Sequence, residues 1–419
     1  MKSSSLLLRS LTTALLFVSF TSCSENLDSS GVCPVLCPPL GGDVQNVTLD
    51  AVVLDTTVQA LSGLGTEPGL LLAARGDTLD TRVIIRYDSL PSAFLPKGDT
   101  TQAITRVDSA YILLHIDTLS IKGSGAVTIE AYDVDTTAND TSSAAVLALF
   151  RPDRFISSQV FNRADLKDSV RYFVSNAAVL ARIQNKTRLR LGLRATGPSS
   201  SQMRIISTEG GTPPLLRFRA TPDTATVPLV VSPFSRTPAG ESITASHLSD
   251  YTVIAKSPPA GSPSNLDVGG LPARRVYLRF DIPSSIIDSA TVVRATLLLN
   301  QIPNSALDPT DTILILPTLV LAGRAVTDPA KAAQITADIA LDTLKVKPGG
   351  SGLTQVELAR AFSVWRTQSR DTTARAIVLR TLTEGNSPLE IRFSSSEDVA
   401  ALRPRLRISY TSRVPLGIP

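Results

Sequence analysis

Six short apolar runs occur twice in the chain in the same order, and this repetition limits the possible folds more than any other feature. The first copy contains the runs 81–88, 109–117, 126–134, 188–194, 203–207 and 216–220, and the second contains 275–281, 289–299, 312–319, 375–380, 390–394 and 405–410. The two series are offset by roughly 190 residues, which indicates a duplicated unit of domain size. The length of 419 residues has room for two such units.

Apolar and polar residues alternate within several of these runs. In 188–194 and in 405–410, every second position is apolar and most of the positions between are arginine. A period of two buries one face of a strand and leaves the other face in water. Because the apolar face of a sheet needs a second layer to cover it, the sequence predicts an all-β fold of two tandem jelly-roll-like β-sandwiches.

We expect one short helix in each copy, closing an end of its sandwich. In the second copy, 354–357 has the form of a capping box, and Leu358, Phe362 and Trp365 follow at helical spacing, which predicts burial of this single tryptophan. The counterpart in the first copy is 175–184. The predicted organisation is a signal peptide (1–22), a tether (23–44), the first sandwich (45–221), a proline-containing linker (222–240), the second sandwich (241–412) and a tail (413–419).

The first 22 residues have the pattern of an export signal. Lys2 and Arg9 are basic, and the apolar segment 11–20 is too short to span a bilayer. The small residues before Cys23 resemble the cleavage site of a bacterial lipoprotein, and Ser24 resembles the sorting pattern for the outer membrane. This resemblance implies an exported outer-membrane lipoprotein with lipid on Cys23. The alternative is an ordinary signal peptide that is cut near the same place.

Charge and cysteine content exclude some functions. Without 1–22, the chain keeps 39 basic and 37 acidic residues, which gives no electrostatic case for nucleic acid. In an oxidising compartment Cys33 and Cys37 are expected to form a small disulfide loop, with a metal site as the alternative. Neither His115 nor His247 has the surroundings of a catalytic base, and we interpret His115 as a structural residue on a sheet face.

Arginines on the polar faces of the last strands in each copy are the main candidates for ligand binding. A planar guanidinium grips a carboxylate with two hydrogen bonds, so uronates or sulfated sugars would be suitable partners. The alternative is that each arginine pairs with an acidic or hydroxyl side chain across strands and protects the sheet from edge aggregation. The glycan-binding candidates are Arg188, Arg190, Arg217, Arg219, Arg405 and Arg407.

The segment 133–140 is the best candidate for a metal site. Asp133, Asp135 and Asn139 offer hard oxygen ligands of the kind that Ca²⁺ prefers. As an EF-hand loop the segment fails, because Ala138 replaces the turn glycine and Ala144 replaces the terminal glutamate. The alternative is an acidic loop between strands. A structural Ca²⁺ is the one cofactor that the sequence suggests.

Part of the second copy resembles the DNRLRE-type domain, a β-sandwich module of bacterial exported proteins. The resemblance lies in 265–282, in 297–299, and in 393–397 together with 403–406, and the first copy matches more loosely. Members of this family occur in surface and wall-associated proteins, and some relatives bind acidic polysaccharides. The resemblance therefore implies a binding or scaffolding role.

These observations predict a non-catalytic cell-surface lipoprotein that binds acidic polysaccharide. The sequence has no nucleophile elbow and no H-E-x-x-H motif. Besides the membrane, through the lipid anchor, the expected partners are an acidic polysaccharide or an envelope protein, and nucleic acid is not expected. A structural or protein-interaction component of the cell envelope is the second hypothesis. The third is a carbohydrate-active enzyme that uses paired carboxylates such as Asp133 and Glu130.

Overall fold

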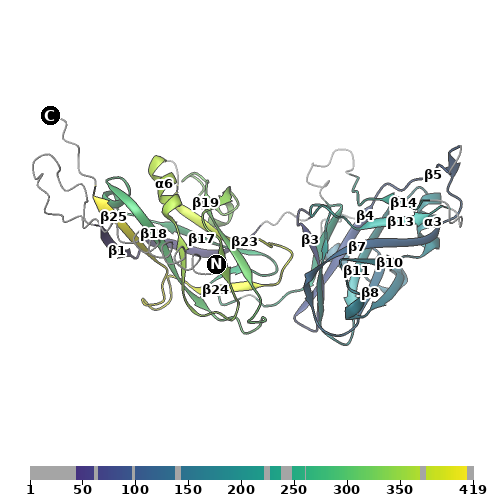
Figure 1. The fold of residues 1–419 in the computed structure, drawn as a ribbon, viewed down its shortest axis with the longest axis horizontal. Helices are drawn as coiled ribbons and strands as arrows, with labels where there is room; N and C mark the ends of the chain where they lie inside the picture. Colours follow the sequence, from purple (N-terminus) through teal and green to yellow (C-terminus); the bar gives the residue numbers. More distant parts are fainter. Residues whose placement is uncertain are drawn as a thin grey trace, which may run out of the picture. The chain divides into compact units, whose positions relative to one another are not determined.

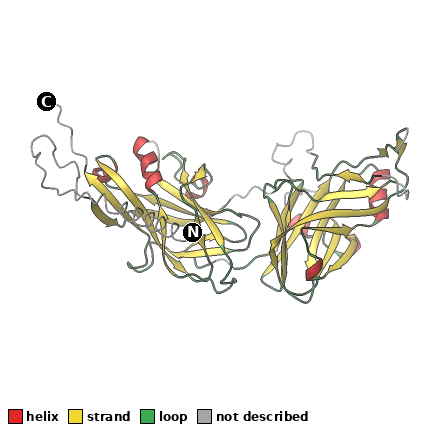
Figure 2. Cartoon of the chain, viewed as in Figure 1, coloured by secondary structure: helices red, strands yellow, loops and turns green. Residues whose placement is uncertain are grey.

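The regular structure of the protein is mostly β-sheet. The computed structural model describes residues 44–60, 65–96, 100–136, 143–220, 227–236, 248–259, 261–368 and 374–412. Two large sheets and a few short helices account for its regular structure (Figure 2), and each large sheet bends back on itself to form a sandwich (Figure 1). The predicted fold class is confirmed. The lipidation, disulfide and metal candidates Cys23, Cys33, Cys37 and Asn139, together with His247, lie outside the described residues.

The first sandwich is built from eleven strands. They are β3 (Gly69–Arg75), β4 (Leu79–Tyr87), β7 (Asp108–Lys122), β8 (Val127–Asp133), β9 (Phe155–Phe161), β10 (Ser169–Phe173), β11 (Leu189–Thr196), β12 (Ser201–Ile206), β13 (Leu215–Arg219), β14 (Leu229–Val231) and β15 (Asp250–Lys256). The spatial order is β14-β13-β7-β12-β3-β4-β11-β8-β9, with β10 on β7 and β15 on β4. β5 (Ala93–Phe94) and β6 (Gln102–Ala103) form a small separate sheet.

The long strand β7 joins the two layers of the first sandwich. Its first half pairs with β10 and β13, and its second half pairs with β12. Alternate residues of the strands on both sides point into one core between the layers, as the period of two predicted. Leu189, Leu191 and Leu193 all lie in this core.

The second sandwich has the same topology. Its strands are β1 (Gln45–Leu49), β2 (Val52–Gln59), β16 (Asn265–Gly269), β17 (Arg274–Phe280), β18 (Ala290–Ile302), β19 (Ile313–Val320), β20 (Thr336–Ala340), β21 (Leu344–Val346), β22 (Gly352–Glu357), β23 (Ala376–Thr381), β24 (Glu390–Ser394) and β25 (Arg405–Ser412). The order β1-β25-β18-β24-β16-β17-β23-β19-β20 matches the first sandwich position by position. β22 pairs with β18 as β10 pairs with β7, and β2 pairs with β17 as β15 pairs with β4.

The strands that complete each sandwich come from an unexpected part of the chain. β1 and β2 pair with β25 and β17 of the second sandwich, although they precede the first sandwich in sequence. β14 and β15 pair with β13 and β4 of the first sandwich. The predicted boundaries therefore need correction: 45–59 belongs to the second sandwich, and 229–231 and 250–256 belong to the first. The prediction assumed that neighbours in sequence are neighbours in space, which is common but not obligatory.

Two side-chain contacts show that β2 and β15 are equivalent strands. Thr252 of β15 accepts a hydrogen bond from the backbone N–H of Leu71 at 2.9 Å, and Thr57 of β2 accepts one from the backbone N–H of Asp267 at the same distance. Thr252 and Thr57 lie opposite matching valines of β4 and β17. Each strand is thus held between its two neighbours by the same threonine.

One nine-residue helix packs into the core of each sandwich. These are α3 (Asn176–Gln184) and α6 (Ala359–Thr367), and shorter helices are α2 (Ser143–Leu147), α4 (Ser284–Ile287), α5 (Pro329–Ala332), η1 (Pro152–Arg154) and η2 (Arg163–Asp165). Trp365 is buried in the second core, as predicted. The predicted capping box is wrong, because residues 352–357 continue the sheet as β22 and the helix begins after them.

The outer face of one layer in each sandwich is covered by a second, smaller apolar cluster. In the first sandwich this cluster joins Ile84 and Tyr132 to Val146 of α2 and to Tyr251 and Val253 of β15. In the second sandwich α5 covers the equivalent region, between β17, β19 and β23. The outer face of a strand, which the alternation predicts to be in water, is therefore partly covered in both sandwiches. Within the described ranges, no helix has the length and apolar character to cross a bilayer.

Candidate functional site

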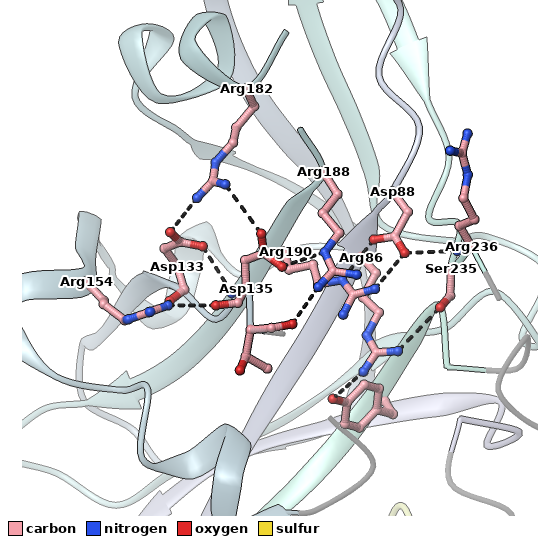
Figure 3. Close-up of polar contacts among 12 residues, drawn as sticks. Arg86, Asp88, Asp133, Asp135, Arg154, Arg182, Arg188, Arg190, Ser235 and Arg236 are labelled. Atoms are coloured by element: carbon pink, nitrogen blue, oxygen red, sulfur yellow. Dashed lines mark hydrogen bonds and ion pairs between the residues drawn. The ribbon is translucent and has the colours of Figure 1, made fainter. Parts of the chain in front are cut away.

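The end of β8 carries an ion-pair network that contains the first predicted arginine. Arg188 donates to Asp135 Oδ1 at 2.6 Å, and Arg182 of α3 donates to Asp133 Oδ2 at 2.5 Å (Figure 3). Arg154 donates to the backbone carbonyl oxygens of both aspartates, at 3.2 and 2.8 Å. The network ties α3 and the loop before β9 to the end of β8.

The same network contains two of the predicted calcium ligands, Asp133 and Asp135, and binds both of them to arginine side chains. Three guanidinium groups surround Asp133 and Asp135, which places positive charge where a Ca²⁺ would have to bind. The carboxylate oxygens are already hydrogen-bonded acceptors, so the arrangement favours the alternative of a structural acidic loop. Among the described residues, no group of three or more His, Cys, Asp or Glu side chains is arranged to hold a metal.

The second predicted arginine, Arg190, forms a buried ion pair. Its guanidinium grips Asp88 with two hydrogen bonds of 2.9 and 2.7 Å, and the exposed fractions of the two side chains are 4% and 2%. Burial alone would raise the pKa of Asp88, but hydrogen bonds from Arg190 and from the backbone of Arg236 lower it below its ordinary value. The expectation that Arg190 faces solvent is wrong, because the segment after β14 and strand β15 cover this face.

Arg86 lies beside this pair and is also enclosed. Its guanidinium stacks on the ring of Tyr251 at 4.9 Å and donates to the Tyr251 hydroxyl at 3.0 Å. A further hydrogen bond of 3.4 Å goes to Ser235 (Figure 3). All three residues are buried. This arginine-rich face of the first sandwich is therefore internal structure rather than a ligand surface.

Arg217 and Arg219 lie in the other layer, on an open face. Arg217 of β13 stands directly opposite Tyr111 of β7 on one side and Val230 of β14 on the other. Tyr111 in turn stands opposite Phe173 of β10. These residues form one row across four strands on the solvent side, since directly paired residues share a face. Arg219 lies opposite Asp108, a cross-strand pairing of opposite charges.

We call this row, together with Arg171, the aromatic face: Tyr111, Arg171, Phe173, Arg217 and Val230. The Tyr111 and Phe173 rings lie 6.1 Å apart at 58°, and the Arg171 guanidinium lies over the Tyr111 ring at 5.1 Å. Phe173 is 52% exposed and Val230 is 53% exposed. The Nε atom of Arg217 has no hydrogen-bond partner among the described residues. The face therefore presents one exposed ring and one half-buried ring beside guanidinium groups.

Side-chain contacts hold the edge of this face in place. β10 is an edge strand, and Gln159 of β9 accepts a hydrogen bond from Phe173 N at 3.1 Å and donates to Arg171 O at 3.3 Å. The Tyr172 hydroxyl donates to Ser157 O at 2.9 Å from the inner side. The backbone that carries Arg171 and Phe173 is thus fixed at both residues, so the rings are presented without a large ordering cost.

The corresponding face of the second sandwich is polar and internally paired. Arg407 of β25 donates to Gln355 of β22 at 3.1 Å, and Ser409 donates to Asn46 of β1 at 2.6 Å. Arg405 lies on the same strand and is half-buried. The six predicted arginines are therefore divided among three faces, two in the first sandwich and one in the second.

Sequence reasoning found Arg217 and Arg219 but missed the rings beside them. Tyr111, Arg171 and Phe173 come from two strands that are far apart in the sequence, and their shared face depends on the register of β7 with β10. His115 lies on the same sheet face, opposite Ser169, as the structural interpretation expected. Of the paired carboxylates considered for catalysis, Glu130 accepts a hydrogen bond from the Tyr132 hydroxyl at 2.8 Å, and Asp133 is bound by Arg182.

Comparisons with known proteins assign the chain to no family. No model of a known protein family matches the chain, and no curated protein matches it. Among solved structures, it is similar to the N-terminal tandem CBM22-1–CBM22-2 domain of Xyn10C from Paenibacillus barcinonensis, with 10% sequence identity and a TM-score of 0.13. That similarity covers 89% of this chain and 98% of the other.

Proposed function

We propose that this protein is a non-catalytic binding protein whose aromatic face holds a polysaccharide with acidic groups. The observation that carries the proposal is the row of half-buried Tyr111, exposed Phe173 and half-buried Arg217 on one sheet face, with exposed Arg171 beside it. Aromatic rings present flat apolar surface to the C–H faces of sugar rings, while guanidinium groups bind carboxylate or sulfate substituents. Both kinds of contact are available on one rigid sheet face.

The dimensions of the face fit a chain better than a single sugar. The row crosses four neighbouring strands, and strands lie about 4.8 Å apart, so it extends over about 14 Å. An open sheet face without deep walls contacts several units of a polymer at once, and affinity then comes from the sum of weak contacts.

We propose an exported lipoprotein of the outer membrane, anchored through lipid on Cys23, with tandem modules of the DNRLRE type. Supporting features are the export pattern of residues 1–22 and the duplicated sandwich. A mature N-terminus at Cys23 that carries the mass of a lipid is the expected result of mass spectrometry.

Affinity electrophoresis on the full chain tests the binding function. In gels that contain polygalacturonate, the wild type should be retarded, and the Y111A/F173A double variant should bind at least tenfold more weakly, which corresponds to about 1.4 kcal/mol. R217S should lose affinity for polygalacturonate more than for neutral glycans, since it removes a charged contact only.

The matched control is R407S, which removes an exposed arginine from the second sandwich. Polygalacturonate should retard it as much as it retards the wild type, each relative to its own mobility in a gel without the polysaccharide. Far-UV circular dichroism and thermal melting establish that each variant is folded. Equal retardation of the wild type and Y111A/F173A would refute the aromatic face as the binding site. Release of soluble product from a glycan panel would instead identify an enzyme.

A further inference from the structure

The second sandwich contains a cavity of about 380 Å³ that the proposed function does not use. It lies at the end of β17, next to the start of β2, and Val53 and Phe280 form apolar parts of its lining. Three of the lining side chains are arginines, Arg279, Arg324 and Arg375, and one is an acid, Asp281. The cavity therefore has an excess of positive charge.

The duplication shows why the cavity is open. Arg279 and Asp281 of the second copy occupy the positions of Arg86 and Asp88 in the first, because β4 and β17 carry the same pattern at the same place in the sheet. In the first sandwich the connection between β14 and β15 runs over eighteen residues, from 232 to 249, and Ser235 reaches Arg86 from it. In the second sandwich the connection between β1 and β2 has two residues, Asp50 and Ala51.

The strand partner differs as well. Tyr251, whose ring and hydroxyl hold Arg86, lies opposite Ile84 of β4, and the residue at the equivalent position of β2 is Thr56, opposite Tyr277. Arg279 therefore has neither the stacked ring nor the serine that enclose Arg86. Arg279 and Arg324 are both exposed, and in the described part of the chain neither makes a hydrogen bond or an ion pair. Their donors are available to a ligand.

Arg375 forms the fixed part of the lining. It is 9% exposed, donates to the carbonyl oxygen of Ile282 at 3.3 Å, and lies 3.7 Å from Asp288. Phe280 N donates to the carbonyl oxygen of Arg375, which locks the two strands together at the cavity. One anchored guanidinium and two exposed arginines thus line one cavity. Asp281 balances only part of this charge.

We infer that this cavity binds an oxyanion group, a carboxylate, sulfate or phosphate, held by Arg279 and Arg324 against the wall formed by Arg375 and Phe280. The first sandwich supplies an internal precedent. There the equivalent arginine, Arg86, donates to the hydroxyl oxygen atoms of Ser235 and Tyr251. In the second sandwich no described residue takes that place, which leaves Arg279 able to donate to the oxygen atoms of a ligand. The geometry of guanidinium donors favours planar or tetrahedral oxyanions over neutral hydroxyls. This site is separate from the aromatic face and does not depend on the proposed function.

Titration calorimetry of the full chain with sodium sulfate, sodium phosphate and trigalacturonate tests the inference. The wild type should bind at least one of them saturably, and R279S/R324S should bind at least tenfold more weakly. Tighter binding of trigalacturonate identifies an acidic glycan as the source of the oxyanion, and tighter binding of sulfate or phosphate identifies a free anion. A neutral trisaccharide should not bind at this site.

Two control variants distinguish this cavity from nonspecific charge and from the aromatic face. R366S removes an exposed arginine from α6 of the same sandwich and should bind like the wild type. Y111A/F173A should keep the oxyanion site, so failure of the proposed function leaves this result unaffected. The single tryptophan, Trp365, has its ring 5.7 Å from Phe280, so its fluorescence reports folding next to the cavity in every variant. The inference is overturned if none of the three anions binds saturably, or if R279S/R324S binds as well as the wild type does.

Discussion

Asp250 is a buried carboxyl group whose two oxygen atoms have different surroundings. Oδ2 accepts hydrogen bonds from Thr208 N at 3.0 Å and from the Thr208 hydroxyl at 2.9 Å. Oδ1 is buried and has no hydrogen-bond partner among the described residues. Burial raises the pKa of Asp250 to about 7, although the Thr208 hydroxyl opposes the shift. A negative charge at this position is therefore costly near neutral pH.

We predict that Asp250 makes the first sandwich less stable as the pH rises. Its pKa is higher in the folded state than in the unfolded state, so the neutral carboxyl stabilises the fold fully below about pH 4, and this contribution is lost as the pH rises to about 7. D250N should flatten the pH dependence and be more stable than the wild type at pH 8. Urea unfolding followed by circular dichroism at pH 5, 6, 7 and 8 measures this, with D77N at a fully exposed aspartate as the control. A parallel pH profile for D250N and wild type would contradict it.

The burial of individual side chains was predicted well where it depends on a single strand or helix. Leu189 and Trp365 are in the cores as expected, because alternation and helical spacing are local properties. Arg190 was misplaced because its burial depends on a segment some forty residues later in the chain, which crosses the outer face of the sheet. Nothing in the sequence of the 188–194 run distinguishes Arg190 from Arg217, which does lie on an open face.

At the scale of elements, β2 and β15 are inserted between strands that would otherwise pair directly. β16 pairs with β17 at one position, and β3 pairs with β4 only near their turn. Beyond these points the inserted strand takes over the pairing, and its threonine, Thr57 or Thr252, satisfies a backbone N–H of the strand on its other side. An N–H left without an acceptor in such a position costs more than the hydrogen bond itself contributes.

We predict similar losses of stability for T57V and T252V. Valine keeps the shape of threonine but removes the acceptor, and the unsatisfied N–H of Asp267 or Leu71 should cost about 1–3 kcal/mol. T57S and T252S, which keep the hydroxyl, should lose less. Denaturant unfolding measures all four variants, with tryptophan fluorescence for the second sandwich and circular dichroism for the first. A cost near zero for either valine variant would show that the threonine is not a structural link.

The repeated strands of each sandwich could be expected from the duplication, but their spatial order and the exchange of flanking strands could not. Runs such as 275–281 have clear alternation, and the structure shows them as β-strands. The segments 45–59 and 250–256 each contribute a strand, and these two strands fill equivalent places, between β16 and β17 in the second sandwich and between β3 and β4 in the first. The contacts of Ser235 and Tyr251 with Arg86, which accompany β15 in the first sandwich, are visible only in three dimensions.

For the whole molecule, the pairing of β1 and β2 makes the second sandwich discontinuous in sequence. Its strands come from 45–59 and from 265–412, and the complete first sandwich lies between these two parts. The first sandwich is thus an insertion in the second, although the two share one topology. Cutting the chain between the sequence repeats does not separate two complete modules.

Fragments of the chain should show this dependence directly. A fragment of residues 65–259 has every strand of the first sandwich and should fold alone. A fragment of residues 261–412 lacks β1 and β2, and it should reach native tryptophan fluorescence and a cooperative melt only when a peptide of residues 44–60 is added. A peptide of residues 227–259 is the control and should not replace it. Cooperative folding of 261–412 without any peptide would disprove the dependence.

The pairing of β1 with β25 also determines how the molecule transmits a mechanical load. Gln45 pairs with Tyr410 and Leu49 pairs with Leu406, so the chain enters and leaves the pair at the same end. Tension applied across residues 45 and 412 therefore breaks the backbone hydrogen bonds between β1 and β25 one after another, rather than loading all of them at once in shear. Such a force reaches the inserted sandwich only after β1 and β2 have been peeled away. The first sandwich, with its aromatic face, is thereby protected from pulling on the two ends of the chain.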